Sequence, residues 1–355
     1  MSEVKLSATL YERFLTCPKS AAFSIDKNFN NLAMPSLRSA LGNVSHRLIE
    51  KSVRIPQGWS EAQISEWFEV NWESCVEEQF SNLIAKWHPN TVLKPQSWPG
   101  YFATRSSAKS LVIKNSGLLP PKTINGETKN YISYFSNDLI LPLIERYLIS
   151  EDLGIAGKPD LVFIENKKAT IYDYKFGNNQ MDLEKHKIQM YFYKLLVESV
   201  LKIEVGKLWI VASANKKWEI PLNQKELDDL AADVPRVLNA LKTNKVAAVP
   251  SLINCRFCSF KSICDQFKDA NFEVYPGRPM AIFGEVLQVR SIDEDFQELR
   301  IISKTKNESV ERTVFGVPKG HTVKSGDMIF LSDNLDFKDA KIIGFSWNSR
   351  IFISG

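Results

Sequence analysis

The chain has 355 residues, enough for two domains, and its hydrophobic share of 44% and charged share of 24% are ordinary for a globular protein. Its net charge of +4 is compatible with a nucleic-acid partner but does not require one, because the basic runs are short and scattered. The first residues lack the apolar core of a signal peptide, and no stretch approaches the roughly 18 to 20 apolar residues that span a bilayer, which predicts a cytosolic protein without a membrane segment.

The N-terminal half has the apolar spacing of helices. Helices are predicted over residues 7–23, opened by a cap at Ser7, over 37–53 and over 60–87. A proline-rich loop over 89–99 ends this pattern. A basic, serine-rich stretch over 104–114 follows, and then a Pro/Gly/Asn segment reaching residue 130 that is predicted to be an exposed insertion.

The pattern changes near Gly154. Residues 157–164 and 169–175 have the alternation of two strands joined by a polar turn, 182–201 is an amphipathic helix, 206–214 is a buried strand and 225–244 is again helical. The order strand, strand, helix, strand, with helices before and after, predicts an α/β layered core.

From about residue 275 the chain changes to short alternating strands, over 282–290, 298–303, 328–331 and 341–347. This predicts a small β-barrel over 275–355, OB-like or SH3-like, after a first domain over 1–270. Its aromatic residues are possible base-stacking platforms for single strands, although most are expected to be barrel core. They are Phe283, Phe296, Phe315, Phe330, Phe337 and Trp347.

Two carboxylates and a lysine occur in Gly157-Lys-Pro-Asp160 and Asp173-Tyr-Lys175. One hairpin between the aspartates would bring both to the same sheet edge, and Asp173 and Lys175 share a face because they are two residues apart. Phosphodiester hydrolysis needs a divalent ion to neutralise the phosphate and activate water, and a lysine can stabilise the developing charge. Taken alone, Asp-x-Lys is more often an ordinary ion pair on a solvated strand.

Three further residues lie on predicted helices, and none of them indicates a function when it is taken alone. His46, in Gly42-Asn-Val-Ser-His46, is on a predicted helix, while Gln189 and Tyr193 are four apart on one helical face. In chain order, Gly-x-x-x-His, Gly-x-x-Asp, Asp-x-Lys and Gln-x-x-x-Tyr resemble the RecB-like branch of the PD-(D/E)XK nucleases. That branch includes the nucleases of CRISPR adaptation and the nuclease domains of AddB-type helicase–nucleases.

The resemblance implies a mixed sheet flanked by helices and a role for each matching residue. It implies that His46, Asp160 and Asp173 bind Mg²⁺ or Mn²⁺ together with the Tyr174 carbonyl. Lys175 would be the catalytic lysine, and Gln189 and Tyr193 would support the site and contact substrate. Aspartate in place of glutamate at 173 is within the superfamily's motif. The segment from Lys51 to Gly154 matches no part of the pattern.

Five cysteines in a reducing compartment argue against disulfides and favour metal or cluster ligation. Cys255, Cys258 and Cys264 form C-x₂-C-x₅-C, and Cys17 is the natural fourth ligand. Spacing alone leaves zinc and an iron–sulfur cluster open. The same arrangement of cysteines resembles the iron–sulfur subset of the family, which implies a 4Fe–4S cluster. Cys75, on a predicted helix, is expected to be a buried bystander.

The chain has no G-x-x-x-x-G-K-[ST] motif, so any duplex unwinding is expected from a partner, such as a separate helicase or other repair or defence subunit, or from fraying ends. The leading hypothesis is a metal-dependent DNA nuclease that acts on single-stranded or frayed DNA in repair, recombination or defence against foreign DNA. The alternatives are a non-catalytic DNA-binding scaffold and a zinc-stabilised RNA-processing enzyme. The intact set of Asp160, Asp173 and Lys175 argues against the scaffold.

Overall fold

The computed structural model describes residues 4–29, 32, 36–86, 94–116, 142–176, 182–213, 215–270, 272–275, 278–304, 309–333, 335–346 and 349–354. The chain forms two compact units: a first unit of Met1–Glu12, Ser36–Phe80 and Pro95–Asn244, and a second unit of Arg13–Pro35, Ser81–Lys94 and Lys245–Gly355. The predicted insertion reaching residue 130 and Trp347 lie outside the described residues. No helix in the described ranges is long and apolar enough to cross a membrane.

The first unit is built on a five-stranded mixed sheet with the strand order β1-β4-β5-β6-β7. Strands β5 and β6 are parallel, because helix α6 carries the chain back between them, and the other neighbours are antiparallel. A two-stranded ribbon of β2 and β3 lies beside α6. The strands are β1 (Leu143–Ile144), β2 (Leu148–Ser150), β3 (Ile155–Gly157), β4 (Leu161–Glu165), β5 (Lys168–Tyr174), β6 (Glu204–Ser213) and β7 (Lys216–Glu219).

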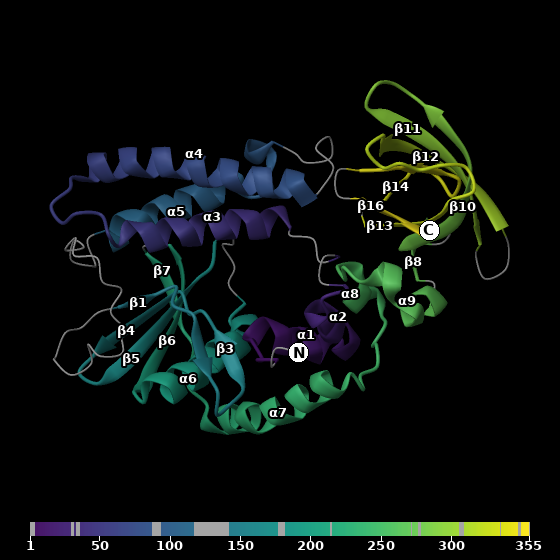
Figure 1. The fold of residues 1–355 in the computed structure, drawn as a ribbon. Helices are drawn as coiled ribbons and strands as arrows, with labels where there is room; N and C mark the ends of the chain where they lie inside the picture. Colours follow the sequence, from purple (N-terminus) through teal and green to yellow (C-terminus); the bar gives the residue numbers. More distant parts are fainter. Residues whose placement is uncertain are drawn as a thin grey trace. The chain divides into compact units, whose positions relative to one another are not determined.

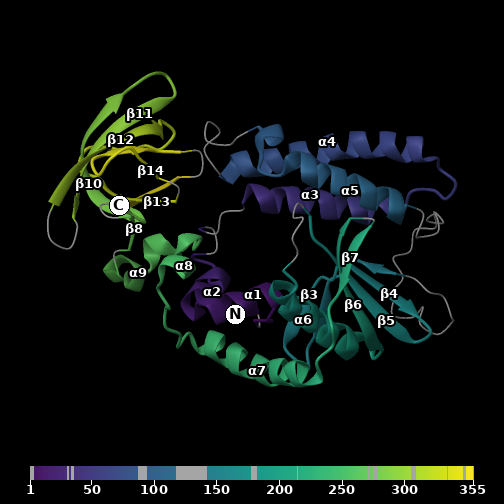
Figure 2. The same cartoon turned by 180° about the vertical axis from the view of Figure 1, so that it is seen from behind.

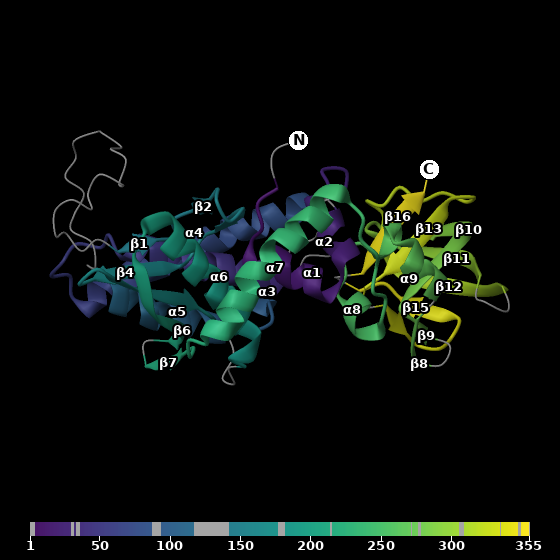
Figure 3. The same ribbon diagram turned by 90° about the horizontal axis from the view of Figure 1, so that it is seen from below.

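Helices cover both faces of this sheet. Figure 1 shows α3, α4 and α5 on one side and α6 and α7 on the other, and Figure 3 shows α7 running beside α6. The helices are α3 (Leu37–Ser52), α5 (Tyr101–Asn115), α6 (Glu184–Leu201) and α7 (Gln224–Thr243), with the short η3 (Pro95–Ser97). Helices α1 (Ala8–Thr16) and α4 (Glu61–Lys86) contribute residues to both units. The layered α/β core predicted from the sequence is therefore present.

The second unit contains a curled seven-stranded sheet, seen from behind in Figure 2, with the order β14-β15-β12-β11-β10-β13-β16. Strand β10 pairs with both β11 and β13, and a Cβ at Gly284 would lie 2.6 Å from the Ile302 carbonyl oxygen, so only glycine allows this close pairing. The curled sheet fits the predicted small barrel, whereas its OB-like or SH3-like type remains a prediction. Its strands are β10 (Ala281–Ser291), β11 (Phe296–Lys304), β12 (Ser309–Pro318), β13 (Met328–Ser332), β14 (Asp336–Phe337), β15 (Ile342–Gly344) and β16 (Arg350–Ser354).

Short helices complete the second unit. Cys255 and Phe267 share a small apolar core with Phe330 of β13, so the helical segment and the curled sheet pack together. The elements are α2 (Pro18–Ile25), α8 (Leu252–Arg256), η5 (Lys261–Ile263), α9 (Asp265–Ala270), β8 (Glu273–Tyr275) and β9 (Arg278–Pro279).

Three of the differences between the structure and the sequence-based elements concern α1, α5 and β12. The predicted helix over 7–23 is capped by the Ser7 hydroxyl as expected, but it is interrupted at Cys17, whose extended backbone (φ −157°, ψ 103°) reflects the restriction that Pro18 imposes on the preceding residue. Helix α5 replaces what the sequence suggested only as a basic, serine-rich stretch. Strand β12 was not predicted, because charged residues obscure its alternation.

Candidate metal and catalytic site

The β4–β5 hairpin brings the two predicted aspartates together. Its register pairs Leu161 with Tyr172, so that Asp160 and Asp173 fall at the next opposed position. The turn residues Asn166 and Lys167 both have positive φ, 49° and 60°, as a two-residue type I′ turn requires. Asp160 is 6% exposed and Asp173 is 1% exposed, so the hairpin holds two carboxyl groups away from solvent.

Asp173 occupies what the strand pattern makes a core position. In β5 the buried residues alternate through Ala169, Ile171 and Asp173. A carboxyl group at such a position costs free energy unless it is paired or bound by a cation. This is the sequence feature that distinguishes Asp173 from an aspartate on a solvated strand.

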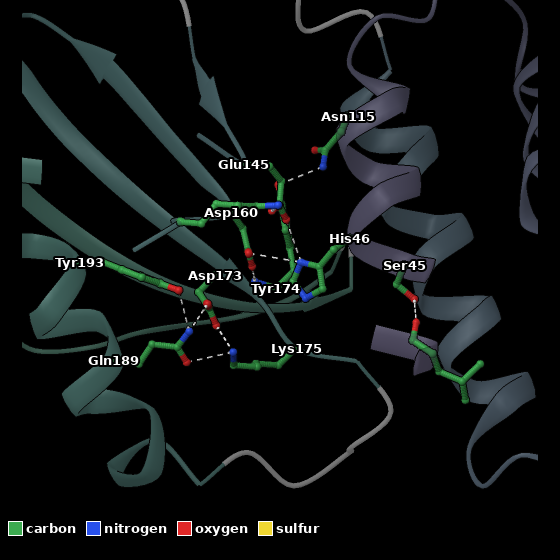
Figure 4. Close-up of polar contacts among 12 residues, drawn as sticks. Ser45, His46, Asn115, Glu145, Asp160, Asp173, Tyr174, Lys175, Gln189 and Tyr193 are labelled. Carbon is green, nitrogen blue, oxygen red and sulfur yellow. Dashed lines mark hydrogen bonds and ion pairs between the residues drawn. The ribbon is translucent and has the colours of Figure 1, made fainter. Parts of the chain in front are cut away.

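His46 of α3 faces the hairpin from the opposite helix layer (Figure 4). Its Nδ1 lies 3.2 Å from Asp160 Oδ1 and 3.2 Å from Glu145 Oε1, directly after β1. One ligand atom from each of these three residues falls within 4.8 Å of the others, which is a group able to hold a metal ion. Glu145 was not among the residues singled out from the sequence.

The charges around His46 compensate one another. Burial opposes protonation of the ring, but hydrogen bonds and charges from Asp160 and Glu145 outweigh it and raise the pKa of His46 to about 10. Burial also acts to raise the pKa of Glu145, yet His46 and Lys158, whose Nζ lies 2.5 Å from Glu145 Oε2, lower it overall. Without a metal ion, a histidinium and a lysine therefore neutralise an acidic site.

A second network holds Asp173 from the other side (Figure 4). Gln189 of α6 donates from Nε2 to Asp173 Oδ1 at 3.0 Å and to the Tyr193 hydroxyl at 3.0 Å, and its Oε1 accepts from Lys175 Nζ at 3.1 Å. Lys175 Nζ also lies 2.6 Å from Asp173 Oδ2. One glutamine thus fixes the carboxylate, the lysine and the tyrosine at once.

The ionisation of Asp173 is disfavoured by its surroundings. Burial first, and then the negative charge of Asp160, raise the pKa of Asp173 to about 6 although Lys175 acts to lower it. Its Oδ2 accepts no hydrogen bond from a described residue, and the contact with Lys175 is an ion pair without hydrogen-bond geometry. A buried carboxylate oxygen in that condition suits a cation.

Tyr174 connects the two networks. Its backbone N–H donates to Asp160 Oδ2 at 2.6 Å, and its hydroxyl accepts from Asn115 Nδ2 of α5 at 3.0 Å. Burial raises the pKa of Tyr174, so the phenol remains neutral and acts as a fixed anchor. The next residue, Lys175, donates its backbone N–H to the Val211 carbonyl of β6, which fixes the end of β5.

Sequence reasoning missed Glu145, Lys158 and Asn115. Glu145 ends the apolar run Leu141-Pro-Leu-Ile144, and Asn115 ends the unpredicted helix α5, so neither is part of a motif. Lys158 is within Gly157-Lys-Pro-Asp160, but the pattern assigns it no role. Only the folded structure places these three residues beside the site residues that the sequence predicted.

The donors present fit a hard divalent ion. A histidine nitrogen and carboxylate oxygens from His46, Asp160 and Glu145, with Asp173 beside them, are ligand types that accept Mg²⁺ or Mn²⁺. Such an ion would replace the positive charge that His46 supplies to the two carboxylates in its absence. With the ion bound, Lys175 would supply a second positive charge at the same site.

The four predicted cysteines line one small cavity in the second unit, together with Phe260 and Phe267. The Val249 N–H donates to Cys17 Sγ at 3.5 Å, the kind of contact that stabilises a thiolate. Burial, followed by the neighbouring thiols, raises the pKa of Cys255 and of Cys264. Cys75 lies apart from this group, buried in α4 in the first unit.

A sheet that presents buried aspartates and a lysine from one hairpin is suited to metal-dependent phosphodiester hydrolysis. The sequence profile of the PD-(D/E)XK nuclease superfamily matches residues 5–265, and the chain belongs to that superfamily. Its members are typically nucleases that use divalent metals such as Mg²⁺ or Mn²⁺.

Two other comparisons add little. A solved structure described as the crystal structure of SSO0001 is similar at 22% identity with a TM-score of 0.20; the match covers 38% of this chain and 62% of that one. The chain thus spans less than two thirds of that protein's length. No curated protein matches.

Proposed function

We propose that this protein is a Mg²⁺- or Mn²⁺-dependent deoxyribonuclease of the RecB-like branch that cleaves single-stranded or frayed DNA. The observation that carries the proposal is the meeting of His46, Asp160 and Glu145 beside the network of Asp173, Lys175 and Gln189. A structural ion pair would not need three further ionisable groups, those of His46, Glu145 and Lys175, around two buried carboxylates.

Each residue has a distinct task in this proposal. His46, Asp160, Asp173 and the Tyr174 carbonyl hold the ion, and we add Glu145 to that set. When bound there, the ion would supply positive charge to the phosphate and would acidify the attacking water. Lys175 places a positive charge where negative charge develops on the phosphate. Gln189 and Tyr193 are positioning residues, because Gln189 holds Lys175 and Asp173 at fixed separations and Tyr193 holds Gln189.

The test is cleavage of labelled single- and double-stranded DNA and RNA in Mg²⁺, in Mn²⁺ and in EDTA. We expect metal-dependent cleavage of single-stranded DNA, a loss of at least about 100-fold in Lys175→Ala, since one charge aimed at a transition state is worth about 3 kcal/mol, and no cleavage by Asp173→Ala. Lys168→Ala, which removes an exposed lysine from the same strand, is the matched control. Full activity of Asp173→Ala would overturn the catalytic assignment, and preferred cleavage of RNA would overturn the substrate.

We also propose that Cys17, Cys255, Cys258 and Cys264 hold a 4Fe–4S cluster. The cavity that all four line, and the N–H donor on Cys17, support this. Purified without oxygen, the protein should absorb broadly near 400 nm and contain about four iron atoms per chain. Cys258→Ala should lose iron, whereas Cys75→Ala should keep it. A colourless protein with one zinc ion would overturn the proposal.

The cellular setting follows from these proposals. Free cysteines that bind a cluster suit the reducing cytosol. DNA ends that need opening would come from a separate helicase or another repair or defence subunit, and copurification of the tagged protein from its own cells tests this. The pathway would be repair, recombination or defence against foreign DNA.

A further inference from the structure

A second cavity lies in the first unit, where α3 ends and the chain turns into α4. It is an open pocket of about 340 Å³, within the roughly 300–1,000 Å³ of ligand pockets. Cationic, aromatic and amide side chains are gathered around it. They are Glu50, Lys51, Arg54, Trp59, Trp67 and Asn71.

The aromatic side chains need an explanation. Trp59 is 37% exposed and Trp67 is half-buried, and neither indole N–H has a hydrogen-bond partner among the residues that the structure describes. Two large rings beside an open cavity offer stacking faces for a planar group. Asn71 donates to the Trp67 carbonyl at 2.9 Å, which fixes its amide at the pocket wall.

The cations complete the chemistry. The Arg54 guanidinium is exposed and makes no ion pair or hydrogen bond to any described residue, and Lys51 Nζ contacts only Cys75 Sγ, at 3.9 Å, in the same part of the chain. Cations are favoured at the C-terminal end of a helix such as α3, but that effect does not gather two tryptophans beside them. Arginine with aromatic rings is the combination that binds a phosphate and a base together.

The pocket lies further along the chain from the helix residue His46 of the candidate metal site. His46 and Glu50 are one turn apart on α3, and Arg54 follows just beyond the end of this helix, on the order of 12 Å from His46. Glu50 also acts electrostatically on Lys158, the partner of Glu145. A strand rising about 3.4 Å per stacked nucleotide crosses this distance in a few nucleotides.

We infer that this pocket binds a nucleotide of single-stranded DNA a few positions away from the scissile phosphate, with the base on Trp59 and Trp67 and a backbone phosphate on Arg54 and Lys51. The inference rests on the proposed nuclease function, which supplies the strand. Two cations against one carboxylate favour an anionic strand over an organic cation, the other ligand that paired tryptophans bind.

The experiment measures binding separately from cleavage. Asp173→Asn serves as the parent variant. Its affinity for a fluorescent oligothymidylate of 12 nucleotides is measured by fluorescence anisotropy at several salt concentrations. Adding Trp59→Ala should weaken binding about 5- to 100-fold, the loss expected for one stacked base. Adding Arg54→Ala should lower the slope of log K against log salt by about 0.7, the value of one phosphate contact.

Two control variants match the changes in size and exposure. Phe102→Ala removes a 69%-exposed ring from α5, and Arg38→Ala removes an exposed arginine from the start of α3; neither should change affinity or slope. Tryptophan fluorescence of the parent should be quenched by the oligonucleotide, and the quench should shrink in Trp59→Ala.

The outcomes separate the pocket from the nuclease. If the wild type cleaves DNA but Trp59→Ala and Arg54→Ala bind like the parent, the inference is overturned and the proposed function stands. If the wild type cleaves nothing while binding still depends on Trp59 and Arg54, the proposed function fails and the pocket stands. Saturable quenching by tetramethylammonium chloride and none by oligothymidylate would overturn the inference in favour of a cation pocket.

Discussion

The negative charge of Asp173 costs the protein free energy. It is buried on the core face of β5, and its surroundings raise its pKa to about 6 from the usual value near 4. A carboxyl group with a raised folded-state pKa binds its proton more tightly in the folded chain than in the unfolded chain. The contribution of Asp173 to the stability of the metal-free protein should therefore be lost as pH rises from about 4 through 6.

Asp173→Asn removes this titration. Relative to the wild type, the variant should gain stability as pH rises from 4 to 7, by on the order of 1–3 kcal/mol, because the amide cannot ionise. Thermal unfolding in EDTA at several pH values measures the gain, and Asp152→Asn, an exposed aspartate in the same unit, is the control. Parallel pH profiles for Asp173→Asn and the wild type would contradict the burial argument. Added Mn²⁺ should raise the melting temperature of the wild type more than that of the variant.

Glu145 is held among His46, Lys158 and Asp160. We expect Glu145→Gln to weaken Mn²⁺ binding about 10- to 100-fold, because one negative charge leaves the site while its shape remains. Titration calorimetry with Mn²⁺ measures the loss. Glu165→Gln, at the exposed end of β4, should bind Mn²⁺ like the wild type. An unchanged affinity in Glu145→Gln would restrict the ligand set to the residues predicted from sequence.

At the scale of elements, the ribbon of β2 and β3 has to approach α6 closely for the network to form. Gly157, at the end of β3, leaves room for this: a Cβ there would lie 3.2 Å from Leu196 Cδ2 and 3.3 Å from Tyr193 Cε1. The glycine of the Gly-x-x-Asp pattern thus has a packing reason. A methyl group would push the ring of Tyr193, whose hydroxyl accepts the hydrogen bond from Gln189.

Gly157→Ala should therefore lower kcat strongly but the free energy of unfolding only slightly. We expect a loss of about 1 kcal/mol in unfolding free energy, typical of mild overpacking, and a larger proportional fall in kcat as Gln189 shifts. Urea unfolding and single-turnover cleavage measure the two effects. Gly206→Ala in β6 is the control, since its Cβ would meet only a Lys168 side-chain carbon at 3.9 Å. Equal cleavage rates and equal unfolding free energies of Gly157→Ala and Gly206→Ala would exclude this packing role of Gly157.

The elements nearest the motifs were the ones that the sequence predicted well. The β4–β5 hairpin, α6 and β6 have clear periods of two or 3.6 residues, and the hairpin register then follows from a two-residue turn. Helix α5 was missed because serine and lysine hide buried positions such as Ala108 and Leu111. Glu145 could not be found, because its approach to His46 depends on long-range packing across 99 residues of sequence.

At the scale of the molecule, the cysteine-bearing segment shares its core with the curled sheet of the second unit. Phe267 packs edge-on against Phe330 of β13, and Phe330 contacts Phe352 of β16. Lys261 is 2% exposed; its ammonium donates to the Cys255 carbonyl at 3.3 Å and to Asp333 after β13. Lys261 therefore links the cysteine-bearing segment to the curled sheet of this unit.

The apolar pattern of the sequence predicts a different division, with a nuclease domain over 1–270 and a barrel over 275–355. Removal of iron from the proposed cluster distinguishes the two divisions. If the cysteines stabilise the core that they share with the sheet, chelation of iron should lower hydrogen-exchange protection in β13 and β16 as well as in residues 252–270. Peptides from the β4–β5 hairpin, in the first unit, should keep their protection. The measurement uses the full chain, with Cys258→Ala as a permanently iron-free reference. Loss of protection in the hairpin and in 252–270, with β13 and β16 unchanged, would instead support the division near residue 270, because the cluster would then stabilise the nuclease domain alone.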